Sequence, residues 1–155
     1  QLSKELVKIA AKSIKQDKKI AIRLNGTSDQ DFISIIKKYN NLDLLNGDQF
    51  KNLVFYDYTA ILGKIKKYIN TNYSLTLSRK EDNENDILQA LKLGGNVAAV
   101  FRGELPTTYK GYNVVNGDTS DLEMLYNKNV ILGLKAKGDA KKDKSGFVID
   151  SYNLN

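Results

Sequence analysis

The sequence predicts an α/β fold in which a mostly parallel sheet alternates with helices. Strand-like and helix-like segments follow one another along the chain, and two strand-like runs are continuously apolar, as in parallel strands buried on both faces. The 155 residues are 41% apolar and 27% charged, which suits a single domain over residues 1–155. A complete (β/α)₈ barrel needs about 250 residues. We therefore expect an incomplete TIM-like barrel, with an open doubly wound sheet as the alternative.

Helices are expected where apolar residues recur every three or four positions. In the first, Leu2, Leu6 and Ile14 lie on one side and four lysines fall elsewhere. Residues 27–29 (TSD) offer N-caps for the second. The expected helices cover residues 2–14, 30–39, 61–69 and 84–93, with a helical turn at 118–125.

Strands are expected where apolar residues alternate with polar ones or run on without a break. The expected strands cover residues 19–24, 53–58, 73–78, 96–101, 112–115, 130–134 and 147–149. In a sheet of parallel strands, ligands bind at the carboxyl ends of the strands. The polar residues that follow each strand are therefore the first candidates for a site.

The residue types that are missing exclude several kinds of chemistry. The chain has no Cys, His or Trp. Disulfides, thiolate nucleophiles, zinc–thiolate sites and iron–sulfur clusters need Cys, and imidazole bases need His. A bound metal would be a hard, oxygen-liking ion such as magnesium. No apolar run is long enough to cross a membrane, so no membrane partner is expected. The chain begins with Gln1 rather than Met, and a fragment lacking an N-terminal part is an alternative to a whole domain.

Charge is distributed in alternating blocks. The net charge is +6, and residues 1–23 and 60–80 each carry +5, whereas residues 81–126 carry −5. A basic balance favours anionic partners, nucleic acid first among them. The alternative is that the lysines only solvate helix faces.

The clearest candidate site is the lysine-rich stretch 133–146 (GLKAKGDAKKDKSG), which follows a buried strand. Glycine allows backbone amides to approach an anion and lysine supplies point charges, so phosphate is the expected ligand. The stretch lacks the lysine of a Walker loop. Arg79 and Lys80 follow another strand. The expected contact set is Arg79, Lys80, Lys135, Lys137, Lys141, Lys142 and Ser145. A flexible, solvated loop is the alternative.

Acidic residues at other strand ends are the candidate catalytic groups. Asp57 lies in an aromatic run and is expected to be half-buried, which requires a cationic partner or a metal. Asp57 and Asp29 are the expected catalytic pair, and with Asp118 they form a candidate set of ligands for a hard cation. The alternative assigns Asp29 and Asp118 to caps or turns and Asp57 to a salt bridge.

Seven stretches, in order from about residue 20 to 149, resemble the gene product 88 family of phage proteins. They are RLNGTSD (23–29), FYDYT (55–59), LTLSR (75–79), GNVA (95–98), YKGY (109–112), NGD with DL (116–122), and GLKAKG to KD with SGF (133–147). The resemblance implies a barrel-type α/β layout, similar to that of radical-SAM-like phage proteins. Members carry a cysteine-rich segment upstream of the matched region and tend to have Lys where this chain has Ala60. No activity is carried over.

The resemblance implies a viral, phage-encoded protein, which we expect in the cytoplasm of the host cell. It is expected to bind a phosphate-bearing partner at the strand ends, nucleic acid being the first candidate, with binding or processing of the strand as the role. One alternative is an enzyme that acts on a small nucleotide or phosphorylated substrate, with Asp57 and Asp29 in a closed pocket. The other is an interaction or virion-associated module without chemistry. Oligomeric state and metal dependence are left open.

Overall fold

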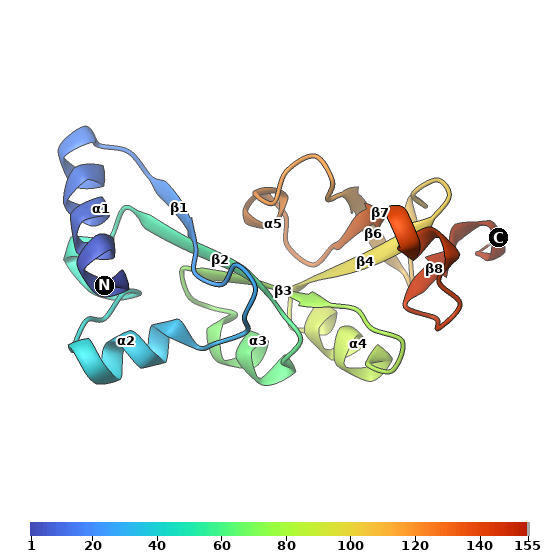
Figure 1. The fold of residues 1–155 in the computed structure, drawn as a ribbon, viewed down its shortest axis with the longest axis horizontal. Coiled ribbons are helices and arrows are strands. Elements are labelled where there is room, and N and C mark those ends of the chain that lie inside the picture. The colour runs from blue at the N-terminus through green and yellow to red at the C-terminus, as the bar shows by residue number, and fades with distance from the viewer. Residues whose placement is uncertain (155) are drawn as a thin grey trace. The chain divides into compact units, whose positions relative to one another are not determined.

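The computed structural model describes residues 1–154 and confirms an α/β fold with a mostly parallel sheet (Figure 1). The chain divides into two compact units. Unit 1 contains residues 1–57 and 70–74, and unit 2 contains residues 58–69 and those from 75 onward. The chain passes between them three times: within β2 (Leu53–Thr59), after Ile69, and within β3 (Tyr73–Ser78). The expected single domain stays a prediction, to be tested by whether the chain unfolds in one transition.

Unit 1 is built on two helices and a strand that precede β2. They are α1 (Leu2–Gln16), β1 (Ile20–Arg23) and α2 (Phe32–Asn40), with a 3₁₀ turn at Asp48–Phe50. Helix α1 buries Leu6, Ala10 and Ser13 on one side and ends at Asp17, which has a left-handed backbone. β1 pairs in parallel with β2, Ile20 opposite Leu53. The backbone N–H of Phe55 donates to Asn72 O just before β3, so the order in this unit is β1-β2-β3.

Strand β2 carries the alternation that a strand with one buried face requires. Leu53, Phe55, Asp57 and Thr59 are buried, and the residues between them are partly exposed. Asp57 is therefore in phase with the apolar side chains of the core.

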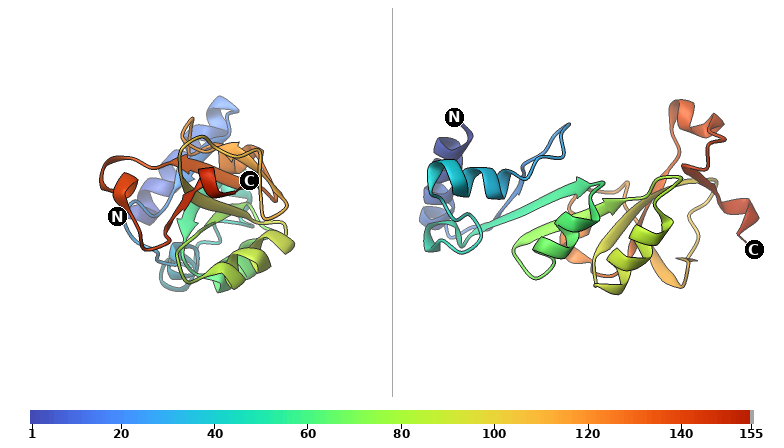
Figure 2. Two further views of the ribbon diagram at one scale, coloured as in Figure 1. Left: turned by 90° about the vertical axis from the view of Figure 1, so that its right-hand side faces the viewer. Right: turned by 90° about the horizontal axis from the view of Figure 1, so that it is seen from below.

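Unit 2 contains the rest of the sheet and three helices. The helices are α3 (Leu62–Tyr68), α4 (Glu84–Lys92) and the four-residue α5 (Glu123–Tyr126). The strands after β3 are β4 (Asn96–Arg102), β5 (Thr108–Tyr109), β6 (Tyr112–Asn116), β7 (Ile131–Lys135) and β8 (Val148–Asp150). Two 3₁₀ turns, Gly138–Lys142 and Ser151–Asn153, flank β8. Helices α3 and α4 lie side by side along the sheet (Figures 1 and 2).

The hydrogen-bonded strand order is β1-β2-β3-β4-β7-β6-β5, and β8 pairs with β4. β1 pairs in parallel with β2, β3 with β4, β4 with β7 and β8, and β6 with β7, whereas β5 and β6 are antiparallel. The sheet of the described residues is not closed, so a barrel is not confirmed. The strands expected at 53–58 and 73–78 agree with β2 and β3 to within one residue at each end. Residues 27–29, which were expected to cap the second helix, do not cap it. Asp31 caps α2 instead, its Oδ1 accepting from Ser34 N–H at 3.2 Å.

Strand β4 has two successive neighbours along one edge. β3 pairs with it as far as Ser78 opposite Ala98, and β8 begins with Val148 opposite Val100. β8 therefore lies along the same edge of β4 as β3, beginning just beyond the point where β3 ends. The segment between β7 and β8, residues 136–147, must return past the carboxyl end of β3, and this is the segment that carries the lysine-rich stretch.

Candidate functional site

In unit 1, Asn25 after β1, Asp57 near the end of β2 and Tyr73 at the start of β3 form one buried network. Asp57 has an exposed fraction of 0%. Its Oδ1 accepts from the backbone N–H of Asn25 at 2.9 Å. Its Oδ2 accepts from Asn25 Nδ2 at 3.1 Å and from the Tyr73 hydroxyl at 2.6 Å. The carboxylate thus joins β1, β2 and β3 at one point.

Asn25 also forms hydrogen bonds with the loop that precedes α2. Its Oδ1 accepts from Ser28 Oγ at 2.7 Å and from Gln30 N–H at 3.0 Å, and its Nδ2 also donates to Gln30 O. Each polar atom of the buried amide is used, as a buried polar group requires. Residues 25–30 therefore serve as an ordered turn around Asn25.

The electrostatics of the network follow from burial. Burial, and then the hydrogen bond to Asp57, raise the pKa of Tyr73 far above its usual value, so the phenol stays protonated and donates. Arg23 Nε lies 3.9 Å from Asp57 Oδ1, which is the cationic partner expected for this carboxylate. Asp57 is more deeply buried than the sequence indicated. In this arrangement Asp57 is a satisfied hydrogen-bond acceptor.

Asp29, the other expected catalytic residue, lies half-buried in the loop between β1 and α2. The catalytic roles of Asp57 and Asp29 stay predictions. Across residues 1–154, no three Asp, Glu, His or Cys side chains gather as metal ligands would. Asp29 and Asp57 belong to unit 1 and Asp118 belongs to unit 2, and their role as a joint set of cation ligands stays a prediction.

In unit 2, the carboxyl ends of β6 and β7 meet at Asp118. Its Oδ2 accepts from the backbone N–H of Lys135 at 2.8 Å, and its Oδ1 lies 3.0 Å from Lys137 Nζ. The Lys135 N–H first, and then Lys137, hold the pKa of Asp118 below its usual value. Lys135 Nζ lies 3.4 Å from Glu104. Two members of the expected contact set, Lys135 and Lys137, therefore have carboxylate partners.

The segment between β7 and β8 is attached to the end of β4 through Arg102. Arg102 Nε donates to Lys141 O at 2.9 Å, and another guanidinium nitrogen donates to Asp143 O. The same guanidinium lies 3.6 Å from Asp150. Arginine suits this role because its planar group offers several donors in a fixed arrangement.

Arg79 attaches the same segment to the end of β3. Its Nη1 donates to Gly146 O and to Phe147 O, each at 2.7 Å. Asp143 accepts from Ser145 Oγ at 2.8 Å and from Val148 N–H at 3.2 Å. The hydrogen bond from Ser145, and then that from Val148, lower the pKa of Asp143. Arg79 and Ser145 therefore order the segment through hydrogen bonds of their own.

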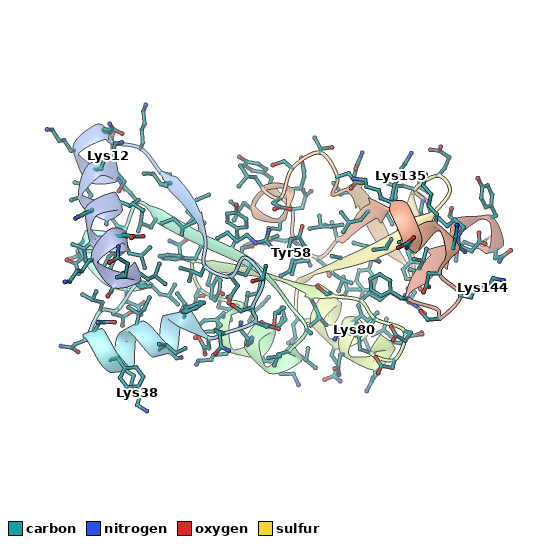
Figure 3. All side chains as sticks on the ribbon, in the orientation of Figure 1. Lys12, Lys38, Tyr58, Lys80, Lys135 and Lys144 are labelled. Atoms are coloured by element: carbon teal, nitrogen blue, oxygen red, sulfur yellow. The ribbon has the colours of Figure 1, made fainter. Side chains whose placement is uncertain are left out.

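Four lysines around this segment project their side chains into solvent. None of these four lysines forms an ion pair within residues 1–154. They are Lys80, Lys141, Lys142 and Lys144. We call these residues the strand-end lysines. Lys80 and Lys144 are labelled in Figure 3. Lys144 is not in the expected contact set, although it belongs to the same lysine-rich stretch 133–146 and could have been included on that ground. The anchoring by Arg79 and Arg102 was missed, because hydrogen bonds to backbone carbonyls leave no trace in a sequence pattern.

A hollow of about 370 Å³ lies elsewhere in unit 2, between residues 104–108 and the C-terminal residues Ser151, Tyr152 and Leu154. It does not contain Asp57 or Asp29. Gly103 at its border has φ +94°, and a Cβ there would lie 2.7 Å from Ser151 Oγ. The close packing of the C-terminal segment therefore requires glycine at this position.

The chain was compared with known protein families, curated proteins and solved structures. A family model described as Gene product 88 matches residues 1–151. No curated protein and no solved structure is significantly similar to the chain. In residues 1–154, none of the helices combines the length and the apolar character that crossing a bilayer takes.

Proposed function

The chain belongs to the Gene product 88 family, and we propose that it binds a phosphate-bearing ligand, nucleic acid in the first place, at the strand ends of unit 2. The observation that carries the proposal is the position of the strand-end lysines. The segment that bears three of them is attached to the ends of β3 and β4 through Arg79 and Arg102, so the lysine backbones have defined places. A flexible solvated loop would not need these attachments.

The charge arrangement supports an anionic partner. Lys135 and Lys137 are compensated by Glu104 and Asp118, whereas Lys80, Lys141, Lys142 and Lys144 have no acidic partner within residues 1–154. Lys80 follows Arg79, and Arg79 contacts the backbone two residues after Lys144, so Lys80 and Lys144 come from adjoining loops. Uncompensated amines on adjoining loops attract phosphates, and each phosphate contact releases counterions from nucleic acid.

Nucleic acid fits better than a single small phosphate. The four amines lie on an exposed surface, where one isolated anion would be strongly solvated and screened. A polyanion contacts several such amines at once, and each contact adds to the binding affinity. The binding expected is therefore insensitive to sequence and sensitive to salt, because contacts to phosphate carry no base information.

The test is a fluorescence anisotropy titration of the full chain with a labelled 16-base-pair DNA duplex at 50 and 200 mM NaCl. We expect binding at 50 mM that weakens steeply at 200 mM. The variant K80Q/K141Q/K142Q/K144Q is expected to bind at least tenfold more weakly and to have a salt slope lower by about 3 to 4, at about 0.9 for each phosphate contact. No binding at 50 mM, or an unchanged variant, would contradict the proposal.

A further inference from the structure

A second basic surface lies in unit 1, on helix α1. Lys4, Lys8, Lys12 and Lys15 are separated by four, four and three residues, which places them in one row along the helix. All four are exposed, and the opposite side of the helix carries the buried residues. Lys12 is labelled in Figure 3. At 1.5 Å per residue the row is about 17 Å long. We call it the α1 lysine row.

The lysines of the α1 lysine row are not neutralised by ion pairs. None of its members forms an ion pair within residues 1–154. Glu5, the acidic residue of the helix, accepts a hydrogen bond from Gln1. Lysines three or four residues apart on a helix repel each other. Lys18 and Lys19, also exposed, add two charges directly after the helix. The row is thus a self-repelling line of positive charge that an extended polyanion would neutralise.

A lipid surface fits the row less well than nucleic acid does. Helices that lie in a membrane interface insert bulky apolar side chains such as Trp, Phe or Leu. On α1, Leu6 and Ala10 are buried in unit 1. The large apolar side chains that α1 exposes are Val7 and Ile14. Little apolar surface is therefore available for insertion, whereas amines spaced at about 6 Å can each contact a phosphate.

From these observations we infer that the α1 lysine row is a second phosphate-backbone contact surface, so that each unit of the chain binds nucleic acid with its own lysines. The inference rests on the proposed function of unit 2. Two surfaces on one chain bind the same polymer more tightly than either alone, because the second contact becomes intramolecular. The contacts are made to phosphates, so the row adds affinity without sequence preference.

The experiment compares two quadruple variants of the full chain in the duplex titration. K4Q/K8Q/K12Q/K15Q removes the row. K38Q/K51Q/K92Q/K128Q removes the same net charge from exposed lysines scattered over the surface. We expect the first variant to lose about tenfold in affinity at 100 mM NaCl and about 3 to 4 in salt slope. The control is expected to change by less than threefold. Equal losses in the two variants would overturn the inference, because net charge alone would then explain binding.

The outcomes separate this inference from the proposed function. If the wild-type chain binds and only the strand-end variant is impaired, the row has no role and the function of unit 2 stands. If only the row variant is impaired, the row binds and the site proposed in unit 2 is wrong. Sedimentation with phosphatidylglycerol vesicles tests a membrane role, and a row variant that loses vesicles but keeps the duplex would overturn the inference.

Folding of the row variant is checked by far-UV circular dichroism and thermal unfolding. Glutamine is a good helix former, and removing mutual repulsion is expected to leave the melting temperature unchanged or higher at low salt. Should the quadruple variant unfold, K8Q/K12Q removes half of the row. About half of the slope change is then expected, and no change would overturn the inference.

Discussion

The strand ends of unit 1 and unit 2 both carry polar residues, but they use them differently. In unit 1, Asp57 is fully buried and accepts hydrogen bonds from Asn25 and Tyr73. In unit 2, the Asp118 side chain keeps 25% of its surface exposed and meets Lys137 in solvent. The comparison teaches that polar residues at the ends of parallel strands do not by themselves mark a binding site. Burial and the number of hydrogen bonds already made decide which end is available to a ligand.

The difference arises from where each carboxylate sits relative to its strand. Asp57 lies within β2 and alternates in phase with Leu53 and Phe55, so its side chain enters the core. Asp118 follows β6 in a turn, where the side chain reaches water. A buried carboxylate needs donors for its lone pairs, whereas an exposed one is hydrated. The first arrangement stabilises a fold, and the second shapes a charged surface.

The largest effect should come from removing the Asp57 carboxylate. Asp57→Ala leaves the Asn25 amide groups and the Tyr73 hydroxyl without their acceptor in the interior of unit 1. We expect a loss of about 3–5 kcal/mol in the free energy of unfolding, measured by urea denaturation. Asp139→Ala, at an exposed position, is the control and should change the free energy by less than about 0.5 kcal/mol. A change below about 1 kcal/mol for Asp57→Ala would show that the network is not an anchor.

The alternation of β2 shows how far sequence patterns reach. The pattern Leu53, Phe55, Asp57 already places the carboxylate on the buried face, since side chains two apart share a face. The pattern therefore predicts that the Asp57 carboxylate is buried, and a buried carboxylate needs hydrogen-bond donors or a cation beside it. It does not identify Tyr73 or Asn25, because they come from other strands whose register is set by tertiary packing. The sequence likewise predicts the positions of β2, β3 and β4 to within one residue at each end. Apolar or alternating runs of this length are typical of strands.

A smaller loss is expected when only the hydroxyl at Tyr73 is removed. Tyr73→Phe keeps the ring in the core and deletes the 2.6 Å hydrogen bond to Asp57. Hydrogen bonds to a charged group contribute about 1.5–3 kcal/mol, and the free energy of unfolding should fall by that amount. Because the pKa of Tyr73 is raised in the folded chain, ultraviolet titration should show at least one tyrosine fewer ionising before unfolding in the wild type than in a denatured sample. Ionisation of all tyrosines in the folded wild type would contradict the buried network.

The sequence predicts only part of the arrangement around the lysine-rich segment of unit 2. Lysine-rich residues after an apolar strand predict an anion-binding segment, and anion binding there stays a prediction. The structure shows that Lys141 and Lys142 are exposed on the segment between β7 and β8. The pairing of Lys135 and Lys137 with acidic residues could not be predicted, because Glu104 and Asp118 follow different strands. Strand β8 was expected, but not its place beside β4. That place brings the segment past the end of β3.

Loosening the attachment of this segment should cost less than disturbing unit 1. Arg102→Gln removes the donors to Lys141 O and Asp143 O and the contact with Asp150. These groups are only partly buried, and water replaces lost partners, so we expect about 1 kcal/mol or less in unfolding free energy. Amide hydrogen exchange in residues 138–146 should instead become at least tenfold faster. Unchanged exchange there would show that Arg102 does not order the segment.

The smallest effect concerns Asp43, which tests whether burial rather than the unit decides the role of a carboxylate. Asp43 belongs to unit 1 like Asp57, yet its side chain is one-third exposed and lies 2.8 Å from Lys37, as Asp118 lies beside Lys137. The Lys37 hydrogen bond, with further bonds from Asn46, lowers the pKa of Asp43 to about 2. A carboxyl whose pKa is lower in the folded than in the unfolded chain stabilises above the unfolded value of about 4, and this is lost as pH falls toward 2.

Asp43→Asn should therefore be less stable than the wild type at pH 6, by under about 1 kcal/mol as for other exposed pairs. The difference should shrink between pH 4 and 2, because the wild-type carboxyl then takes up its proton. Urea denaturation of both proteins at pH 6, 4, 3 and 2 measures it, and the subtraction cancels the titration of the other carboxylates. A difference that persists at pH 2 would mean that Asp43 acts through its shape in the turn rather than its charge. Exposed carboxylates would then resemble Asp57 more than Asp118, and burial would not be the property that separates the two strand ends.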